Sequence, residues 1–183
     1  MVDKAWLKNI YLEYQNLVYS VAVSIIRDGQ LAEDIMQEVF VTLYFKYDTI
    51  RDQSKIKPWL IRITVNRTLD FTRKLKRSVI LPEDYFERLE DTSITDPTSE
   101  MAEKELTLEI RKAIDKLPED LKALVVLSYF LEIPLKEIAA SLELPLGTVK
   151  TRLRRARFIL KEHLLGQQTT ANLFPDQGVS HYE

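Results

Sequence analysis

The stretch "LKEIAASLELPLGTVKTRLRRARFILKEHL", residues 135–164, has the pattern of two helices joined by a tight turn. Its first part, residues 135–142, has the apolar spacing of a short amphipathic helix, with Pro134 at the start. Residues 143–146 make a tight connection, and Gly147–Thr148 opens the next helix with a capping hydroxyl. A short helix, a tight turn and a second helix rich in Arg predict a helix-turn-helix, which is a DNA-binding motif.

The second of these helices separates apolar from basic side chains. At about 100° per residue, one narrow stripe contains Val149, Leu153, Ala156 and Leu160. The opposite side contains Lys150, Arg154, Arg157 and Lys161, with Thr151 and Arg155 at its flank. Burial of the apolar stripe would present the basic side to a major groove and its phosphates. The alternative is a solvated basic helix within a bundle. The helix-turn-helix pattern, the capping hydroxyl and the separation of apolar from basic side chains together favour DNA binding.

Charge is unevenly distributed along a chain whose net charge is only −2. Residues 46–78 carry ten basic and three acidic side chains, and residues 145–163 carry six basic and one acidic. Between these basic blocks, residues 79–120 carry five basic and thirteen acidic side chains. For a single basic block, the simpler interpretation would be a helix face exposed to solvent. Two blocks, each late in its own helical unit, favour two contacts with a polyanion.

The composition is that of a globular protein, and no feature of it requires a cofactor. The 183 residues include no Cys, which excludes disulfides and thiolate metal sites. The four Gly are scattered singly, the two His lie far apart in the sequence, and no nucleophile–base spacing is recognisable. We therefore expect no catalytic residues, no metal site, no cofactor and no enzymatic activity. Without a signal-peptide pattern or an apolar run of ~20 residues, a cytoplasmic protein with no membrane insertion is expected.

Almost every segment outside two polar stretches has helical periodicity. Helices are expected from Trp6 to Ile25, from Leu31 to Tyr44, from Pro58 to Arg77, and through much of 101–165. The predicted fold is all-α: two small helical domains joined by a flexible acidic linker, with the helix-turn-helix in the C-terminal domain. The boundaries predicted for these parts are 1–78 for the N-terminal domain, 79–103 for the linker, 104–165 for the C-terminal domain and 166–183 for a disordered tail.

The helix expected from Pro58 to Arg77 combines an aromatic, an amide and guanidinium groups on one face. This face contains Trp59, Arg62, Asn66, Asp70, Arg73 and Arg77, and the other face contains Leu60, Thr64, Thr68, Phe71 and Leu75. Such a stripe suits stacking on a base and contact with a phosphate backbone. Core packing is an equal alternative for Trp59, because large aromatic side chains are usually buried.

The helix expected from Leu31 to Tyr44 has an acidic face opposite its apolar one. Asp34, Gln37 and Glu38 lie on that face with Glu33, whereas Val39 and Phe40 are expected in the core. A solvated face is the simpler interpretation, and docking on a basic protein partner is the other.

Three segments resemble bacterial RNA polymerase sigma factors of the extracytoplasmic-function (ECF) group. "AEDIMQEVFVTLY" (32–44) is similar to the helix that contacts the polymerase clamp in that group, and "KPWLIRITVNRTLDFTRKLKR" (57–77) to the helix that engages the opened −10 element. Residues 117–160 resemble the promoter-reading domain. The likeness covers about residues 11–165, with an acidic linker in the corresponding place. Pro134 departs from the capping residue that relatives often carry there.

The resemblance implies a sigma factor that binds core polymerase at its clamp and flap, recognises −35 duplex DNA and opens the −10 element into single strands. The −35 contacts it implies are Thr148, Lys150, Thr151, Arg154, Arg155, Arg157 and Lys161. The −10 contacts it implies are Lys55, Lys57, Trp59, Arg62, Asn66, Arg73, Lys74 and Arg77, with 47–57 as a base-capturing loop. It assigns Asp34, Gln37 and Glu38 to the polymerase, and it implies an anti-sigma factor as a further partner. The linker acids could mimic RNA phosphates, although a solubilising spacer is almost as good an interpretation.

Two other functions are compatible with parts of the sequence. An autonomous helix-turn-helix regulator would read palindromic half-sites as a dimer, but it leaves the Trp59 helix and the acidic helix unexplained. A nucleic-acid-processing enzyme would need carboxylates at metal-ligand spacing, and none are found.

Overall fold

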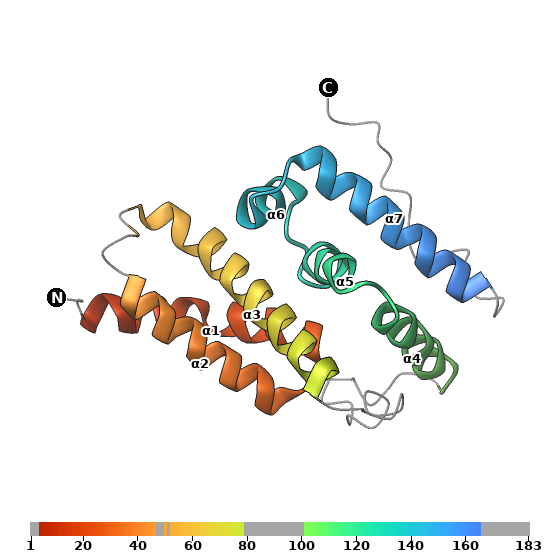
Figure 1. Ribbon diagram of the computed structural model, residues 1–183, viewed down its shortest axis with the longest axis horizontal. Helices are drawn as coiled ribbons and strands as arrows, with labels where there is room; N and C mark the ends of the chain where they lie inside the picture. The colour runs from red at the N-terminus through yellow and green to blue at the C-terminus, as the bar shows by residue number, and fades with distance from the viewer. Residues whose placement is uncertain (1–3, 47–49, 51, 79–100, 166–183) are drawn as a thin grey trace.

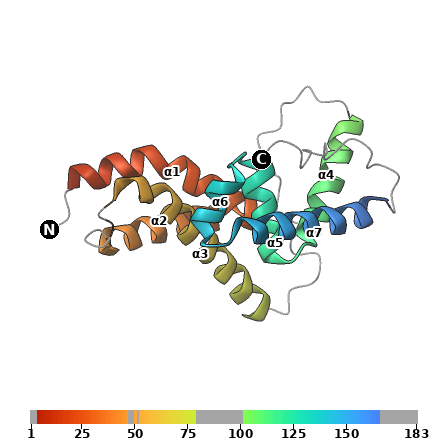
Figure 2. The ribbon, with the colours of Figure 1, turned by 90° about the horizontal axis from the view of Figure 1, so that it is seen from above.

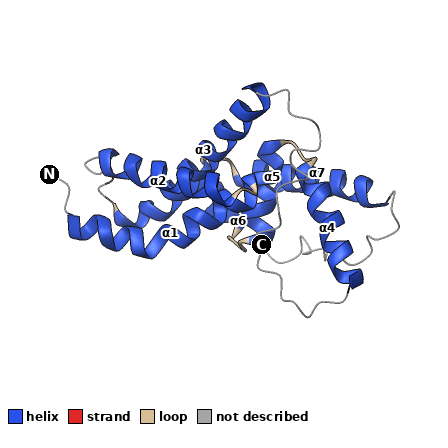
Figure 3. Cartoon of the chain, turned by 90° about the horizontal axis from the view of Figure 1, so that it is seen from below, coloured by secondary structure: helices blue, strands red, loops and turns tan. Residues whose placement is uncertain are grey.

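The computed structural model describes residues 4–46, 50, 52–78 and 101–165. Those residues form helices and connections, with no strand in the ranges described (Figures 1 and 3). The elements in chain order are α1 (Lys4–Ile26), α2 (Gly29–Lys46), η2 (Gln53–Lys55), α3 (Ile56–Ser78), α4 (Met101–Asp115), α5 (Glu119–Val125), η4 (Val126–Phe130), α6 (Leu135–Leu142) and α7 (Leu146–Leu165). The predicted all-α class, with two helical units and a C-terminal helix-turn-helix, is confirmed.

The N-terminal unit is a three-helix arrangement in which α1, α2 and α3 all pack on one another. Its core takes residues from each helix, including Val18 and Ala22 of α1, Val39 of α2 and Leu60 of α3. Phe40 is also buried, as its sequence position predicted. The hydroxyls of Thr64 and Thr68 are buried as well, and each donates to the carbonyl four residues earlier in α3, at 2.7 and 2.8 Å. These bonds let polar side chains lie within an apolar contact without an unpaired donor.

The turn between α1 and α2 is built from residues that end one helix and start the next. Arg27 adopts a left-handed conformation (φ 59°), and its backbone N–H donates to the Val23 carbonyl at 2.8 Å. The Asp28 carboxylate then accepts from the Leu31 N–H at 2.9 Å. The interruption that the sequence shows at residues 27–30 is therefore a helix stop followed directly by a helix start.

The C-terminal unit places α7 against α4, α5 and α6. The predicted apolar stripe of α7 is confirmed, since Val149, Leu153, Ala156 and Leu160 are all buried. The turn before α7 contains Glu143 in the left-handed conformation (φ 53°, ψ 41°), which ends α6. In Figure 1, α7 runs along the outer edge of this unit.

The two units are in contact through a shared apolar core. One buried cluster joins Val21 and Ile25 of α1 and three residues of α3 to the interior of the C-terminal unit. Packing of α6 on α3 is the main contact, and α5 and η4 add smaller ones. Figure 2 shows the resulting arrangement from above.

Several element boundaries differ from those expected. The third helix begins at Ile56, so Pro58 lies within the first turn, where its missing N–H has no helical partner to lose. The last helix begins at Leu146, directly after Pro145, so Thr148 lies inside the first turn and the predicted capping hydroxyl is wrong. The predicted linker (79–103) reaches three residues into α4, and most of it, together with the tail (166–183), lies outside the described residues.

Candidate nucleic-acid and polymerase interfaces

The basic side of α7 is presented to solvent. The side chains of Lys150, Thr151, Arg154, Arg155 and Lys161 are exposed, and those of Thr148 and Arg157 are half-buried. Across the described ranges, no carboxylate lies within ion-pair distance of Arg154, Arg155 or Arg157. Arg152, on the far side of the helix, instead lies 3.6 Å from the Asp120 carboxylate of α5. The structure thus places all the predicted −35 residues on α7, five of them exposed and two half-buried.

The candidate −10 residues on α3 are in a different situation, because several contact other parts of the chain. The Lys57 ammonium lies 2.7 Å from the Glu137 carboxylate of α6, and Arg62 pairs with Glu143 in the turn that follows α6. Trp59 is half-buried and packs against the N-terminal core. The helix-turn-helix unit therefore covers part of the face predicted to read the −10 element.

The remaining −10 candidates lie along α3 and just before it. Asn66 and Lys74 are exposed, and Arg73 pairs with Asp70 one turn earlier at 3.0 Å. Lys55 lies 3.9 Å from Asp52 at the entry to α3. Arg77 is within α3, but its side chain is outside the described set, as is most of the loop 47–57 before Asp52.

The entry to α3 is fixed by a local cap. The Asp52 carboxylate accepts from the Ser54 hydroxyl at 2.6 Å and from the Ser54 backbone N–H at 3.0 Å. These two donors, with a smaller contribution from the charge of Lys55, hold the pKa of Asp52 below its usual value of 3.8. The cap orients η2 and the first basic residues of α3.

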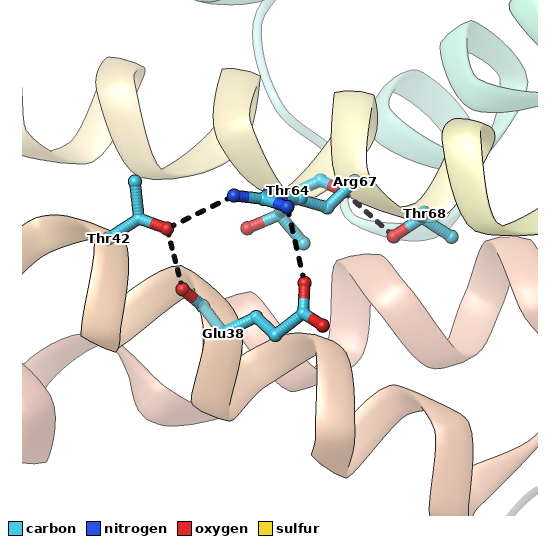
Figure 4. A network of polar contacts seen from close by, with 5 residues as sticks. All are labelled: Glu38, Thr42, Thr64, Arg67 and Thr68. Carbon is cyan, nitrogen blue, oxygen red and sulfur yellow. Dashed lines mark hydrogen bonds and ion pairs between the residues drawn. The ribbon is translucent and has the colours of Figure 1, made fainter.

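The acidic face of α2 is accessible, and one member of it is tied to α3. Asp34, Gln37 and Glu38 are all exposed. Figure 4 shows Arg67 of α3 reaching the Glu38 carboxylate at 3.3 Å and the Thr42 hydroxyl at 3.4 Å, while that hydroxyl donates to the Glu38 carbonyl. Glu38 is therefore part of the α2–α3 contact as well as of the surface.

Two features of these surfaces were missed by sequence reasoning. Val41 and Phe45 of α2 are 56 % and 76 % exposed, and helical spacing puts them on the same side as Asp34 and Glu38. On α3, the residues Ile61, Val65 and Leu69 form a third face that is buried against the C-terminal unit. These three residues are four apart in the sequence, which is helical spacing, but charged residues lie between them and obscure the stripe.

The described residues contain no cluster of three or more His, Cys, Asp or Glu side chains able to hold a metal ion. Among the same residues, no helix is both long and apolar enough to cross a membrane.

Comparison with known proteins identifies both units. Residues 10–78 match the family model for Sigma-70 region 2, and residues 107–157 match that for Sigma-70, region 4. The ECF RNA polymerase sigma factor SigW of Bacillus subtilis is 32 % identical over 160 residues, which cover 82 % of this chain and 84 % of the relative. The ECF RNA polymerase sigma factor SigM of the same organism is 31 % identical over 155 residues, covering 85 % and 93 %.

Solved structures share the fold. The sigma factor RpoE of Bartonella quintana, in complex with the anti-sigma factor NepR, matches with a TM-score of 0.63 at 24 % identity, over 88 % of this chain and 98 % of that one. CnrH, in complex with the cytosolic domain of CnrY, matches with a TM-score of 0.63 at 20 % identity, over 90 % and 91 %. With two family regions in order and relatives above 30 % identity along most of its length, the chain belongs to the ECF sigma factors of RNA polymerase.

Proposed function

We propose that this sigma factor reads the −35 element with the exposed side of α7, engages the opened −10 element with α3, and docks on core polymerase through the acidic side of α2. The observation that carries the proposal is the division of α7. Its four predicted apolar residues are buried, and the basic residues opposite them are accessible and unpaired within the described chain. This arrangement fits insertion into a major groove, with guanidinium groups available for base edges and phosphates.

The assignment of α3 is supported by its chemistry. Trp59 retains an accessible part, Asn66 is exposed, and Arg62 lies one turn after Trp59 on the same face. Aromatic and guanidinium groups stack on unpaired bases, and Lys and Arg side chains neutralise the backbone phosphates. Capture of exposed bases on this face would offset the cost of melting the duplex.

Docking through α2 is supported by a surface that combines acidic and exposed apolar side chains, because a face that only contacts water has no use for the apolar ones. Asp34, Gln37 and Glu38 provide charge and hydrogen-bonding capacity, and Val41 and Phe45 provide exposed apolar area beside them. Charges at the rim of such a contact steer association, and the apolar residues supply most of the affinity. The polymerase clamp is the partner we assign to this surface, and the flap is assigned to the C-terminal unit.

Other partners and the setting follow from the family. The relative from Bartonella quintana was solved with an anti-sigma factor, and an inhibitor of this class is proposed for the present chain as well. The protein works where RNA polymerase works, in the cytoplasm. As a specificity subunit it performs no catalysis itself.

The direct test is runoff transcription with purified core polymerase on a pool of genomic fragments, followed by footprinting on the promoters obtained. The holoenzyme is expected to protect −35 and −10 elements and to open the latter, whereas core polymerase alone initiates at neither. A footprint over both elements from the free protein, at physiological salt, would instead favour an autonomous regulator.

A further inference from the structure

A closed set of three polar contacts joins α3 to the acidic face of α2. The Arg67 guanidinium donates through Nη1 to the Glu38 carboxylate at 3.3 Å and through Nη2 to the Thr42 hydroxyl at 3.4 Å. That hydroxyl donates in turn to the Glu38 carbonyl at 2.7 Å. Figure 4 shows Arg67 reaching both residues, which lie one helical turn apart on α2. A guanidinium holds its donors in a fixed planar fork, so one side chain can hold two acceptors at defined positions.

The backbone is fixed on both sides of this contact. In α3, Thr64 and Thr68 flank Arg67, and both are fully buried. In α2, Val39 follows Glu38 directly and is fully buried as well. The part that is free to vary is therefore the long side chain of Glu38, which is 57 % exposed. An exposed Glu without a partner samples many rotamers and loses this freedom when it is immobilised.

The charge of Arg67 also affects the acidic face of α2. Asp34 and Glu38 are both exposed and lie one turn apart, and like charges at this spacing repel each other. The cation beside Glu38 offsets this repulsion, so two carboxylates can share one face of the free protein. Arg67 meets only Oε2 of Glu38. Among the described residues the other oxygen forms no ion pair, and it can therefore accept a hydrogen bond from a partner.

We infer that Arg67 is a positioning residue for polymerase docking, because its guanidinium holds Glu38 in the orientation in which the carboxylate meets the polymerase. The inference rests on the docking role proposed for α2. Arg67 acts by preorganisation: the rotamer of Glu38 is selected before the partner arrives, so less side-chain freedom is lost on binding. A residue of the helix proposed to engage DNA thereby serves the polymerase contact, although Arg67 is not one of the residues assigned to DNA.

The first experiment keeps the charge and removes the fork. Arg67→Lys retains a cation at this position, but an ammonium is a single point that cannot reproduce both contacts. The control is Arg152→Lys, which makes the same change at an Arg that pairs with Asp120 in the C-terminal unit. Affinity for core polymerase is measured without DNA by fluorescence anisotropy. Arg67→Lys is expected to bind about threefold more weakly than the control. Equal affinities would overturn the inference.

Arg67→Gln tests the sign of the effect. By charge alone, loss of a cation from an acidic face should strengthen docking on a basic partner. Positioning predicts the opposite, because the Glu38 carboxylate is released and its ordering cost returns on binding. We expect Arg67→Gln to bind core polymerase about threefold more weakly than wild type. Binding as tight as that of wild type, or tighter, would show that Arg67 does not position Glu38.

A double-mutant cycle separates positioning from a direct contact and from a general loosening of the helices. If Arg67 acts through Glu38, Arg67→Lys should cause no further loss of affinity in the Glu38→Ala background. An equal loss in both backgrounds would contradict the inference. Arg67 would then contact the polymerase itself or serve only the packing of α2 on α3.

The second acceptor of the fork provides an independent measurement. Thr42→Val keeps the shape of the side chain and removes the hydroxyl that Arg67 contacts. Thr72→Val is the matched control, because its hydroxyl also donates to the carbonyl four residues earlier but lies on α3 itself. Thr42→Val is expected to bind core polymerase about twofold more weakly than Thr72→Val. Identical affinities would show that the hydroxyl of Thr42 does not help to hold the guanidinium in place.

Failure of the docking proposal is read separately, from Glu38→Ala alone. This variant should bind core polymerase about fivefold more weakly than wild type. Undiminished binding would remove Glu38 from the polymerase contact, and both the docking role of Glu38 and the inference would fall. Weakened binding by Glu38→Ala, combined with unchanged binding by Arg67→Lys, would overturn the inference alone. Urea unfolding of each variant establishes that the chain is folded in these measurements.

Discussion

The helices α3 and α7 are both basic and both proposed to meet DNA, yet their surroundings differ. In α7 one apolar stripe is buried and the cations opposite it are accessible. In α3 there are two buried apolar faces, one against the N-terminal core and one against the helix-turn-helix, and Lys57 and Arg62 are paired with carboxylates. A basic helical pattern therefore indicates where cations lie but not which groups they contact in the free protein.

The difference in exposure matches the two kinds of DNA that the helices are proposed to bind, duplex for α7 and single strands for α3. In the proposed function, α7 binds −35 DNA that is already duplex before opening, so its basic side can be exposed in the free protein. In the same proposal, the −10 single strands form only after polymerase has engaged, so the cations of α3 are not needed for DNA before that step. A covered α3 also limits binding to unrelated polyanions, since non-specific attraction depends on accessible cations.

The largest effect is expected from the core that supports the α7 face. Leu160 is fully buried, and Leu160→Ala should lower the free energy of unfolding by about 2–5 kcal/mol through lost apolar contact and a residual cavity. Urea titration followed by circular dichroism measures this. Phe158→Ala, at an exposed apolar residue of the same helix, is the control and should change stability far less. Equal losses in both variants would show that the stripe is not the supporting face.

The next effect concerns the accessible side of α7. Arg154→Ala should weaken binding of the holoenzyme to −35 duplex by about 1–3 kcal/mol if the guanidinium contacts a base edge, and by less for a phosphate contact. Arg152→Ala removes the same charge from the far side of the helix, where Asp120 is its partner, and should weaken binding much less. Competition with unlabelled promoter at fixed salt distinguishes them. Indistinguishable affinities for the two variants would refute the orientation assigned to α7.

A smaller effect is expected on α2. Asp34→Lys should weaken core polymerase binding by about 1 kcal/mol, roughly fivefold, because it places a like charge against a basic partner at the rim of the contact. Glu13→Lys makes the same reversal at an exposed position of α1 and serves as the control. Glu38→Lys is less clean, because it would also set a cation against Arg67 within the α2–α3 contact. Titration by fluorescence anisotropy at two salt concentrations should show the Asp34→Lys loss shrinking as salt rises.

Many buried residues of this molecule could be predicted from helical periodicity, because the spacing of side chains within one helix is enough to identify its apolar face. The apolar stripe of α7 and the burial of Val39 and Phe40 follow from helical spacing, which a helix imposes whatever it packs on. The pairing of Lys57 with Glu137 could not be predicted, because it depends on how two units, far apart in sequence, pack together. The Ile61–Val65–Leu69 face was in principle visible but ambiguous, since a stripe of three apolar residues does not identify its partner. The predicted cap at Thr148 was wrong because the helix begins earlier, directly after Pro145. Sequence patterns do not distinguish well between adjacent residues as the first residue of a helix.

The smallest expected effect is on the pKa of Asp52, and it concerns the different ways in which α3 and α7 begin. The last helix, α7, begins directly after Pro145, whereas the entry to α3 depends on the Asp52 carboxylate and its two donors from Ser54. Because these donors hold the pKa of Asp52 below 3.8, the folded chain binds this proton less readily than the unfolded chain. The stabilisation is therefore fully present above about pH 4 and is lost as the pH falls through the lowered pKa, so neutral-pH stability is insensitive to it.

Ser54→Ala tests this by removing the hydroxyl donor, which is the largest cause of the shift, and leaving the backbone N–H in place. The pKa of Asp52 should then rise part of the way toward 3.8, as followed by the pH dependence of its carboxyl resonance in nuclear magnetic resonance spectra. Asp70 in the same unit provides an internal reference, since its partner Arg73 is untouched by the change. If the Asp52 midpoint does not move while the chain remains folded, the hydroxyl is not what lowers it, and the entry to α3 is held by the backbone donor alone.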